Sequence, residues 1–155
     1  MIVVGPSEAF HALERAAAMV DNLSFEARRR AMAAVKSTGT SPELLVRRTV
    51  HALGYRFRLH DASLPGKPDL VLKKMRLAIF VHGCYWHGHS CSRGNRIPKS
   101  NTKYWRAKIG GNVARDRRNL AGIHKQGWRT LVIWECQLRR DDLSGWLARR
   151  LAPFA

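Results

Sequence analysis

The chain has 155 residues, of which 45% are hydrophobic, enough for one globular domain with its own core. It carries 28 Lys and Arg residues against 11 Asp and Glu, a formal net charge of +17, so a polyanionic partner is expected. No apolar run reaches the ~18 residues of a membrane span, and a secretory signal is not expected, because the first residues lack a basic segment followed by an apolar one. DNA and RNA are therefore better candidates than an anionic membrane. Three cysteines cannot all pair with one another, which indicates a reducing cytoplasm.

Two helices are predicted in the first third of the chain. Residues 1–23 are expected to form a helical N-terminal extension, and residues 24–155 a single domain. Ser24 is the predicted N-cap of a helix that ends near residue 35. The segment Ser41-Pro42-Glu43 predicts a second helix start, with Ser41 as the cap and proline in the first turn. Gly54 is its natural end.

The remaining elements follow from hydrophobic periodicity and turn residues. The apolar, β-branched strand that begins at Thr130 is expected in the centre of the sheet. Gly110-Gly111 is a candidate break in a long basic helix. From the helix that begins at Ser41 onward, the resulting order is α-β-β-β-α-β-α, a mixed sheet flanked by helices. The predicted strands cover residues 55–60, 69–72, 77–81 and 130–134, and the helices residues 102–125 and 143–151.

A group of metal-binding side chains follows the third predicted strand. Cys84, His89 and Cys91 have the spacing C-x4-H-x-C, and the one other cysteine, Cys136, is the expected fourth ligand. Three cysteines and a histidine are a common closed ligand set for structural Zn²⁺. Buried thiols beside surface histidines are the plainer interpretation of any single residue. The agreement of spacing with ligand number favours zinc, which would fix this loop to the last strand.

Acidic and histidine side chains flank the same loop. Asp69 opens a predicted strand, where its carboxylate is an oxygen ligand suited to Mg²⁺. If this strand and the next form a hairpin, Asp69 meets Val81–His82, and the Val81 carbonyl adds a second oxygen ligand. His87 could activate water as a general base, and Glu43 could hold a metal-bound water or orient a histidine. Alone, Asp69 would be a turn residue and Glu43 an acid at a helix N-terminus; together they indicate a metal-dependent nuclease.

Aromatic and basic side chains lie close to these groups. Tyr85-Trp86 stands between Cys84 and His87, where two aromatics on a rigid loop suit stacking between bases. The alternative is that both belong to the core. A cluster of cations follows, of which several are expected to contact phosphate and others to form a solvated face. Its members are Lys99, Lys103, Arg106, Lys108, Arg115, Arg117 and Arg118.

Several segments together resemble one nuclease family, the very short patch repair (Vsr) mismatch endonucleases, a branch of the PD-(D/E)xK restriction-endonuclease-like fold. The resemblance covers about residues 21–140. Most PD-(D/E)xK enzymes carry Glu-x-Lys on the second strand, where this chain has Phe80-Val81-His82, so imidazole chemistry replaces the lysine. The matching segments are Thr40–Glu43, Asp61–Asp69, Phe80–His87, Cys91, Asn112, Arg115-Asp116, Gly127–Arg129 and Trp134–Cys136.

The resemblance implies a fold and a set of site residues. The fold is α/β, with a restriction-endonuclease-like mixed central sheet flanked by helices and a structural zinc site. Asp69 and the Val81 carbonyl would bind Mg²⁺, and His87 would be the catalytic histidine, supported by His82 and Glu43. The zinc ligands would be the four residues inferred above. The resemblance implies DNA contacts by Tyr85 and Trp86 from one groove and by Met32 from the other. From the basic cluster, Lys99, Lys103 and Arg115 are the expected further DNA contacts.

The implied function is a Mg²⁺-dependent endonuclease that nicks one strand of double-stranded DNA 5′ to the T of a T·G mismatch. It would initiate repair of deaminated 5-methylcytosine in a bacterial cytoplasm, linked to a cytosine-5 methyltransferase and to mismatch-repair proteins. Nicking of one strand suggests a monomer. Two alternatives remain. One is a nicking or restriction-type nuclease of the same fold with a different target. The other is a non-catalytic, zinc-stabilised DNA-binding module.

Overall fold

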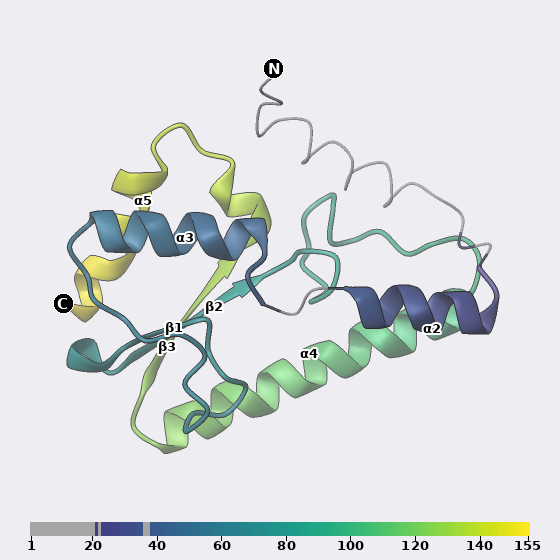
Figure 1. Ribbon diagram of the computed structural model, residues 1–155, viewed down its shortest axis with the longest axis horizontal. Helices are drawn as coiled ribbons and strands as arrows, with labels where there is room; N and C mark the ends of the chain where they lie inside the picture. The colour runs from purple at the N-terminus through teal and green to yellow at the C-terminus, as the bar shows by residue number, and fades with distance from the viewer. Residues whose placement is uncertain (1–20, 22, 36–37) are drawn as a thin grey trace.

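The computed structural model describes residues 21, 23–35 and 38–155 (Figure 1). The predicted N-terminal extension falls almost entirely outside these residues. Within the described part, a small mixed sheet is enclosed by helices on both faces, as predicted. No described helix is long and apolar enough to cross a bilayer.

The sheet has three strands in the order β1-β2-β3. β1 (Leu70–Leu72) pairs antiparallel with β2 (Leu77–His82), and β2 pairs parallel with β3 (Arg129–Trp134). The prediction that the last strand is central was wrong, because β2 holds that place in the described sheet. β3 lies at an edge, but helices cover both of its faces, and a strand covered on both faces has the same apolar composition as a central one.

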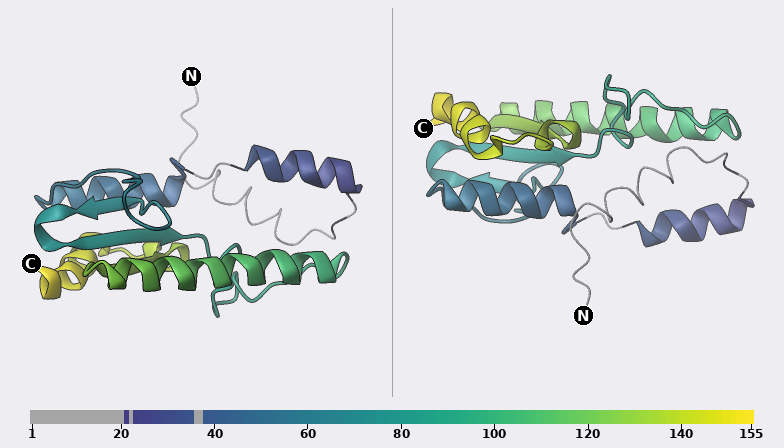
Figure 2. Two further views of the ribbon diagram at one scale, coloured as in Figure 1. Left: turned by 90° about the horizontal axis from the view of Figure 1, so that it is seen from below. Right: turned by 90° about the horizontal axis from the view of Figure 1, so that it is seen from above.

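Two hydrophobic clusters hold the layers together. α3 (Ser41–Ala52) and α5 (Leu143–Leu151) cover one face of the sheet, and α4 (Thr102–Lys125) covers the other (Figures 1 and 2). Alternate strand residues point into each layer, as the pleat requires. Each fully buried aliphatic side chain contributes about 1.5–3 kcal/mol of apolar transfer. The α3/α5 cluster includes Val46, Val50, Leu70, Ile79, Ile133, Leu147 and Leu151; the α4 cluster consists of Leu64, Val71, Ala78, Phe80 and Ile123.

The two helices predicted near the N-terminus are present. α2 (Phe25–Ala34) begins after Ser24, whose hydroxyl accepts from the Ala27 N–H at 3.2 Å. α3 ends just before Gly54, as predicted. The predicted N-cap, Ser41, was wrong by one residue, because Thr40 is the N-cap and Ser41 is already helical. The reason is Glu43, whose Oε2 accepts the Thr40 N–H at 3.3 Å and so fixes Thr40 at the helix boundary.

The strand predicted over residues 55–60 does not form. Only Arg58 makes a bridge, to Val71, with N–H···O distances of 2.9 and 2.8 Å. The alternation of burial also fails at Leu59, which is 44% exposed. β1 is only three residues long, and the chain turns at His60 with φ 48°, so the neighbouring edge is too short for a full strand.

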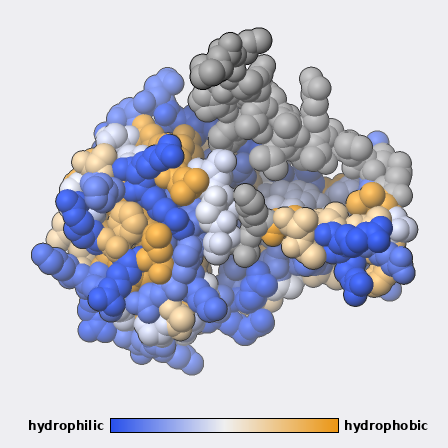
Figure 3. Space-filling model, viewed as in Figure 1, coloured by the Kyte–Doolittle hydropathy of each residue, from blue (hydrophilic) through white to orange (hydrophobic). Residues whose placement is uncertain are grey.

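The predicted break in α4 is also absent, because the helix continues through Gly110 and Gly111. A Cβ at either glycine would meet nothing within 4 Å, so this is an open helix surface. Figure 3 shows hydrophobic side chains interrupting a hydrophilic surface over α3 and α2. The exposed large hydrophobic residues of these two helices include Leu44, Leu45 and Phe25. Scattered exposed apolar residues are ordinary on protein surfaces and mark no interface by themselves.

Candidate functional site

Asp69 lies at the open end of the β1–β2 hairpin. Its Oδ2 accepts the Val81 N–H at 2.7 Å, so the structure places it against the end of β2, as the predicted hairpin requires. The N–H and C=O of one strand residue point to the same edge, so the Val81 carbonyl faces the side on which Asp69 lies. Burial raises the pKa of Asp69, and the Val81 hydrogen bond and nearby cations oppose this rise. A bound cation would offset this cost of burial, because a positive charge favours the ionised carboxylate.

Asp69 belongs to a carboxylate cluster that also contains Glu43 and His60. One ligand atom from each lies within 4.8 Å of the others. Glu43 is almost fully buried, and its Oε1 is 3.2 Å from His60 Nε2. Arg47, one turn along α3, contacts both Glu43 and His60. The histidine in contact with Glu43 is therefore His60.

A histidine cluster of His82, His87 and Asp116 lies on the α4 side of the sheet. The two imidazoles stack with their centroids 3.9 Å apart and their planes 9° apart. His87 Nδ1 is 2.6 Å from Asp116 Oδ2 on α4. Burial, with a further contribution from His87, lowers the pKa of His82 to about 4, so this imidazole is neutral at neutral pH. An aspartate at Nδ1 leaves His87 Nε2 available to accept a proton.

The third group is a thiolate cluster formed by Cys84, His89, Cys91 and Cys136. Their ligand atoms lie within 4.8 Å of one another, although Cys136 is 45 residues from Cys91 along the chain. Cys136 N–H donates to Cys84 Sγ at 3.3 Å, and burial raises the pKa of Cys84 to about 12. A Cβ at Gly94 would overlap the carbonyl oxygen of His89, so the loop closes around the cluster only with glycine there.

The carboxylate and histidine clusters are neighbours. Val81 and His82 are consecutive residues of β2: the Val81 N–H donates to Asp69, and the His82 ring stacks on His87. Asp69 and His87 thus belong to two adjacent groups rather than to one. The thiolate cluster begins two residues after His82, so all three groups are placed by the end of β2 and the loop that follows it.

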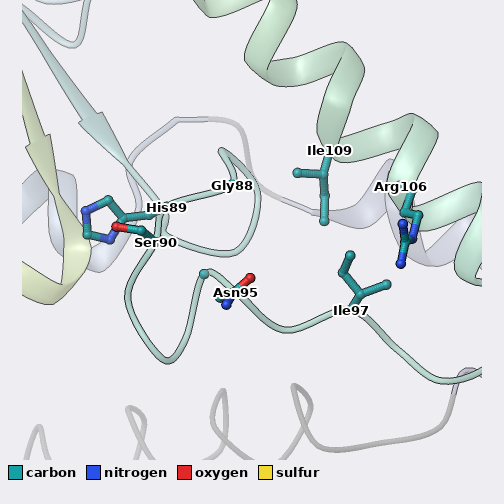
Figure 4. Close-up of a pocket in the computed structure, with 8 residues that line it drawn as sticks. Gly88, His89, Ser90, Asn95, Ile97, Arg106 and Ile109 are labelled. Atoms are coloured by element: carbon teal, nitrogen blue, oxygen red, sulfur yellow. The ribbon is translucent and has the colours of Figure 1, made fainter.

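A cavity of about 380 Å³ lies between that loop and α4 (Figure 4). Ile97 on the loop and Ile109 on α4 point toward one another across it, with Arg106 on the same helix and His89 at the far end. Its lining holds none of the acidic side chains of the other two clusters. The candidate chemistry therefore lies outside this cavity, at the end of the sheet.

Comparison with known proteins shows what these residues are similar to. The family described as DNA mismatch endonuclease Vsr matches residues 20–93. A Type II nicking enzyme, V.XorIIP of Xanthomonas oryzae pv. oryzae, is 50% identical over 131 residues, which are 84% of this chain and 94% of the relative. V.NmeAIP of Neisseria meningitidis, also a Type II nicking enzyme, is 43% identical over 81% of this chain and 89% of its own.

The DNA mismatch endonuclease Vsr of Escherichia coli is likewise 43% identical, over 73% of this chain and 72% of its own length. The chain belongs to the Vsr family of DNA endonucleases. The family resemblance predicted from the sequence is confirmed, and with it a mixed sheet flanked by helices. The three clusters are therefore side chains of a Vsr-family nuclease.

The predicted aromatic wedge of this Vsr-family chain is half-buried. Tyr85 and Trp86 pack edge to face with centroids 5.1 Å apart, and both lie against Trp105 of α4, at 5.9 and 6.2 Å. Asn112 donates to the Trp86 carbonyl at 2.9 Å. The sequence left open a stacking pair on a loop and a pair in the core; in the structure both residues are half-buried and one side of the pair rests on α4. That contact fixes the rings, which a stacking role requires as much as exposure.

The other predicted DNA contacts of this Vsr-family chain lie on two helices and a loop. Lys99, Lys103 and Arg115 are exposed, and Met32 is half-buried on α2. Asp21 ties the segment before α2 to the start of α4, since its carboxylate accepts from Arg28 at 2.7 Å and from Trp105 at 2.9 Å. The start of α2 is therefore attached to the body of the domain.

Sequence reasoning missed several residues of the site. Asp116 was part of the family pattern but was given no role, because its contact with His87 spans 29 residues. His60 and Arg47 were read as members of a strand and a helix, and nothing in their spacing pointed to Glu43 and Asp69 together. Trp105 lies within the predicted long basic helix and was given no role of its own. In each case the signal would have been a tertiary contact.

Proposed function

We propose that this Vsr-family endonuclease nicks one strand of duplex DNA 5′ to the T of a T·G mismatch, with Mg²⁺ at Asp69. The observation that carries the proposal is the placement of Asp69, against Val81, beside the His87–Asp116 pair at one end of the sheet. A cation ligand and a base that can accept a proton from water are the two parts that metal-assisted phosphodiester hydrolysis needs.

His87 acts as the general base. The Asp116 carboxylate accepts the Nδ1 hydrogen, holds the ring in one orientation, and stabilises the imidazolium that forms when Nε2 takes a proton from water. His82 stacks on this ring and stays neutral, so it adds no charge that would oppose protonation of His87. Glu43 keeps the N-terminus of α3 in place beside Asp69.

The residues fit the two metals implied by the family. Asp69 and the Val81 carbonyl offer oxygen ligands on one edge of β2, which suits Mg²⁺; when bound, the ion activates water and stabilises the leaving oxygen. Cys84, His89, Cys91 and Cys136 provide a complete tetrahedral set for Zn²⁺. The zinc would have no open position and would join the loop of His87 to the end of β3.

The aromatic pair provides the proposed mismatch preference. Tyr85 and Trp86 would enter the base stack from one groove, and Met32 from the other. A mismatched step stacks and pairs less well, so opening it costs less than opening an intact step. The proposed role is repair of deaminated 5-methylcytosine by a monomer built from residues 24–155. It would work beside a cytosine-5 methyltransferase and mismatch-repair proteins in the bacterial cytoplasm.

A second candidate is a nicking enzyme that acts on another target, such as an intact recognition sequence. The names of the relatives favour it, because the 50% identical protein and the 43% identical Neisseria protein are both described as Type II nicking enzymes. The family description and the Escherichia coli relative favour the mismatch. Both candidates use the same catalytic residues and differ only in the duplex that is cut, a T·G mismatch or another target.

A nicking assay separates these candidates. The purified chain is incubated with Mg²⁺ and a panel of intact and mismatched duplexes in varied sequence contexts. Rapid nicking of T·G duplexes alone supports the mismatch reading, and equal nicking of intact duplexes supports the second candidate. Asp69→Ala and His87→Ala should abolish nicking without loss of fold or zinc, whereas Asp141→Ala and His51→Ala, at exposed positions, should not. Full activity of either site variant, or binding without cleavage of any duplex, would refute the assignment.

A further inference from the structure

The guanidinium of Arg47 sits between Glu43 and His60 where a metal ion would fit. Its Nη2 contacts Glu43 Oε1 and is 2.8 Å from His60 Nε2, and these two acceptor atoms are 3.2 Å apart. Neighbouring ligands of an octahedral ion bound at about 2.0–2.1 Å are separated by about 3 Å. The two acceptors therefore have the spacing of adjacent ligand positions, with a cationic side chain against both.

Glu43 presents one oxygen to this position and uses the other elsewhere. Its Oε2 accepts the N–H of Gly39 at 2.6 Å and of Thr40 at 3.3 Å, which leaves Oε1 facing Arg47 and His60. The carboxylate side chain is only 3% exposed. A buried carboxylate needs a positive partner, and in this structure Arg47 provides it. The same oxygen is the one that a metal ion would bind.

Arg47 is not fully satisfied in this position. Its Nε is buried and has no hydrogen-bond partner among the described residues, which carries a desolvation cost. Its side chain is 17% exposed, so a route to solvent exists. His60 holds its place with φ 48°, a left-handed conformation that is uncommon for residues other than glycine. The Arg47 guanidinium is thus held by its contacts with Glu43 and His60, while its Nε stays without a partner among the described residues.

We propose that Glu43, His60 and Asp69 form one divalent-cation site, and that the Arg47 guanidinium occupies it until the metal binds. Metal and arginine then compete for the same carboxylate, so loading requires Arg47 to move away. The imidazole nitrogen makes the donor set mixed, which favours Mn²⁺ and later transition metals over Mg²⁺. This inference rests on the proposed function in one respect, the assignment of a divalent cation to Asp69.

The test is Mn²⁺ binding without DNA, measured by the loss of the free-ion electron paramagnetic resonance signal. The full-length chain is first loaded with one equivalent of Zn²⁺, because thiolates prefer zinc to manganese. Arg47→Met should bind Mn²⁺ at least about tenfold more tightly than wild type, since a unit charge a few ångströms away opposes the ion. Arg48→Met removes an exposed charge from the same helix and should change nothing. If Arg47→Met does not fold, Arg47→Gln takes its place.

Two further variants identify the ligands. His60→Gln combined with Arg47→Met should lose the gained affinity, and Asp69→Asn should weaken binding in both backgrounds. If Arg47→Met binds no more tightly while Asp69→Asn still weakens binding, the competition is refuted and the metal at Asp69 stands. A gain that survives His60→Gln refutes the nitrogen ligand. If Asp69→Asn has no effect anywhere, the proposed function itself fails.

Discussion

His87 Nδ1 lies 2.6 Å from Asp116 Oδ2, although the two residues are 29 positions apart and belong to a loop and to α4. The contact gives the loop imidazole a fixed orientation and an anionic partner. It also makes α4, the helix of the predicted DNA contacts Lys103 and Arg115, part of the candidate catalytic machinery. The aspartate was not among the predicted catalytic residues.

Asp116→Asn is expected to lower the nicking rate by about a hundredfold or more, because the base loses the carboxylate that stabilises its protonated form. Single-turnover nicking at several pH values measures the effect. Asp141→Asn, an exposed position after β3, is the control and should be neutral. A wild-type rate for Asp116→Asn would show that the aspartate only helps the loop to fold.

Cys136→Ser should remove the proposed zinc and loosen the loop that carries His87. Wild type is expected to contain one zinc per chain by elemental analysis. Losing a structural metal costs several kcal/mol, which for a chain of this length lowers Tm by about 10 °C. His51→Gln, an exposed histidine on α3, should keep both zinc and Tm. Wild-type zinc content in Cys136→Ser would contradict the four-ligand site.

Asp21→Ala should loosen the attachment of α2 to α4, because the Asp21 carboxylate accepts hydrogen bonds from the side chains of Arg28, Trp105 and Asn101. Burial opposes ionisation, but the hydrogen bonds from Arg28 and Trp105 lower the pKa of Asp21 below its ordinary 3.8. A pKa lowered by folding means that the stabilisation is present at neutral pH and is lost as the pH falls below about 3.8.

Hydrogen exchange of the α2 amides tests this attachment. Protection of these amides from exchange should be lower in Asp21→Ala than in wild type at neutral pH. In wild type, protection should fall when the pH is lowered below about 3.8. Glu26→Ala, at an exposed position in the first turn of α2, is the control. Equal protection in Asp21→Ala and wild type would mean that other contacts hold α2.

Lys103→Ala and Arg115→Ala should each reduce the salt dependence of DNA binding by about one unit of slope in a plot of log affinity against log salt concentration. Both side chains are exposed on α4, the helix that also carries Trp105, which packs on Tyr85, and Asp116, which contacts His87. Arg149 on α5, with a side chain 70% exposed on the other side of the sheet, is the matched control and should leave the slope unchanged. Equal slopes for all variants would place the DNA elsewhere.

Local chemistry in the sequence determined much of this protein. Helix caps, turn glycines and apolar periodicity predicted α2, α3, α5, β1 and β2 within a residue or two, since these signals act over a few neighbouring positions. The spacing of Cys84, His89 and Cys91 and the count of cysteines likewise predicted the thiolate cluster before any coordinates. Family-specific segments identified the nuclease.

Only the tertiary structure decided which distant groups meet. β2 is the central strand because it pairs with β1 in a hairpin and with β3 through the crossover that contains α4. The apolar composition of the strands does not determine this order. The contact of Asp116 with His87 depends on the rotation and packing of α4, and that of Arg47 with His60 on where α3 crosses the hairpin. Contacts of this kind are set by packing between elements, which no local spacing along the chain encodes.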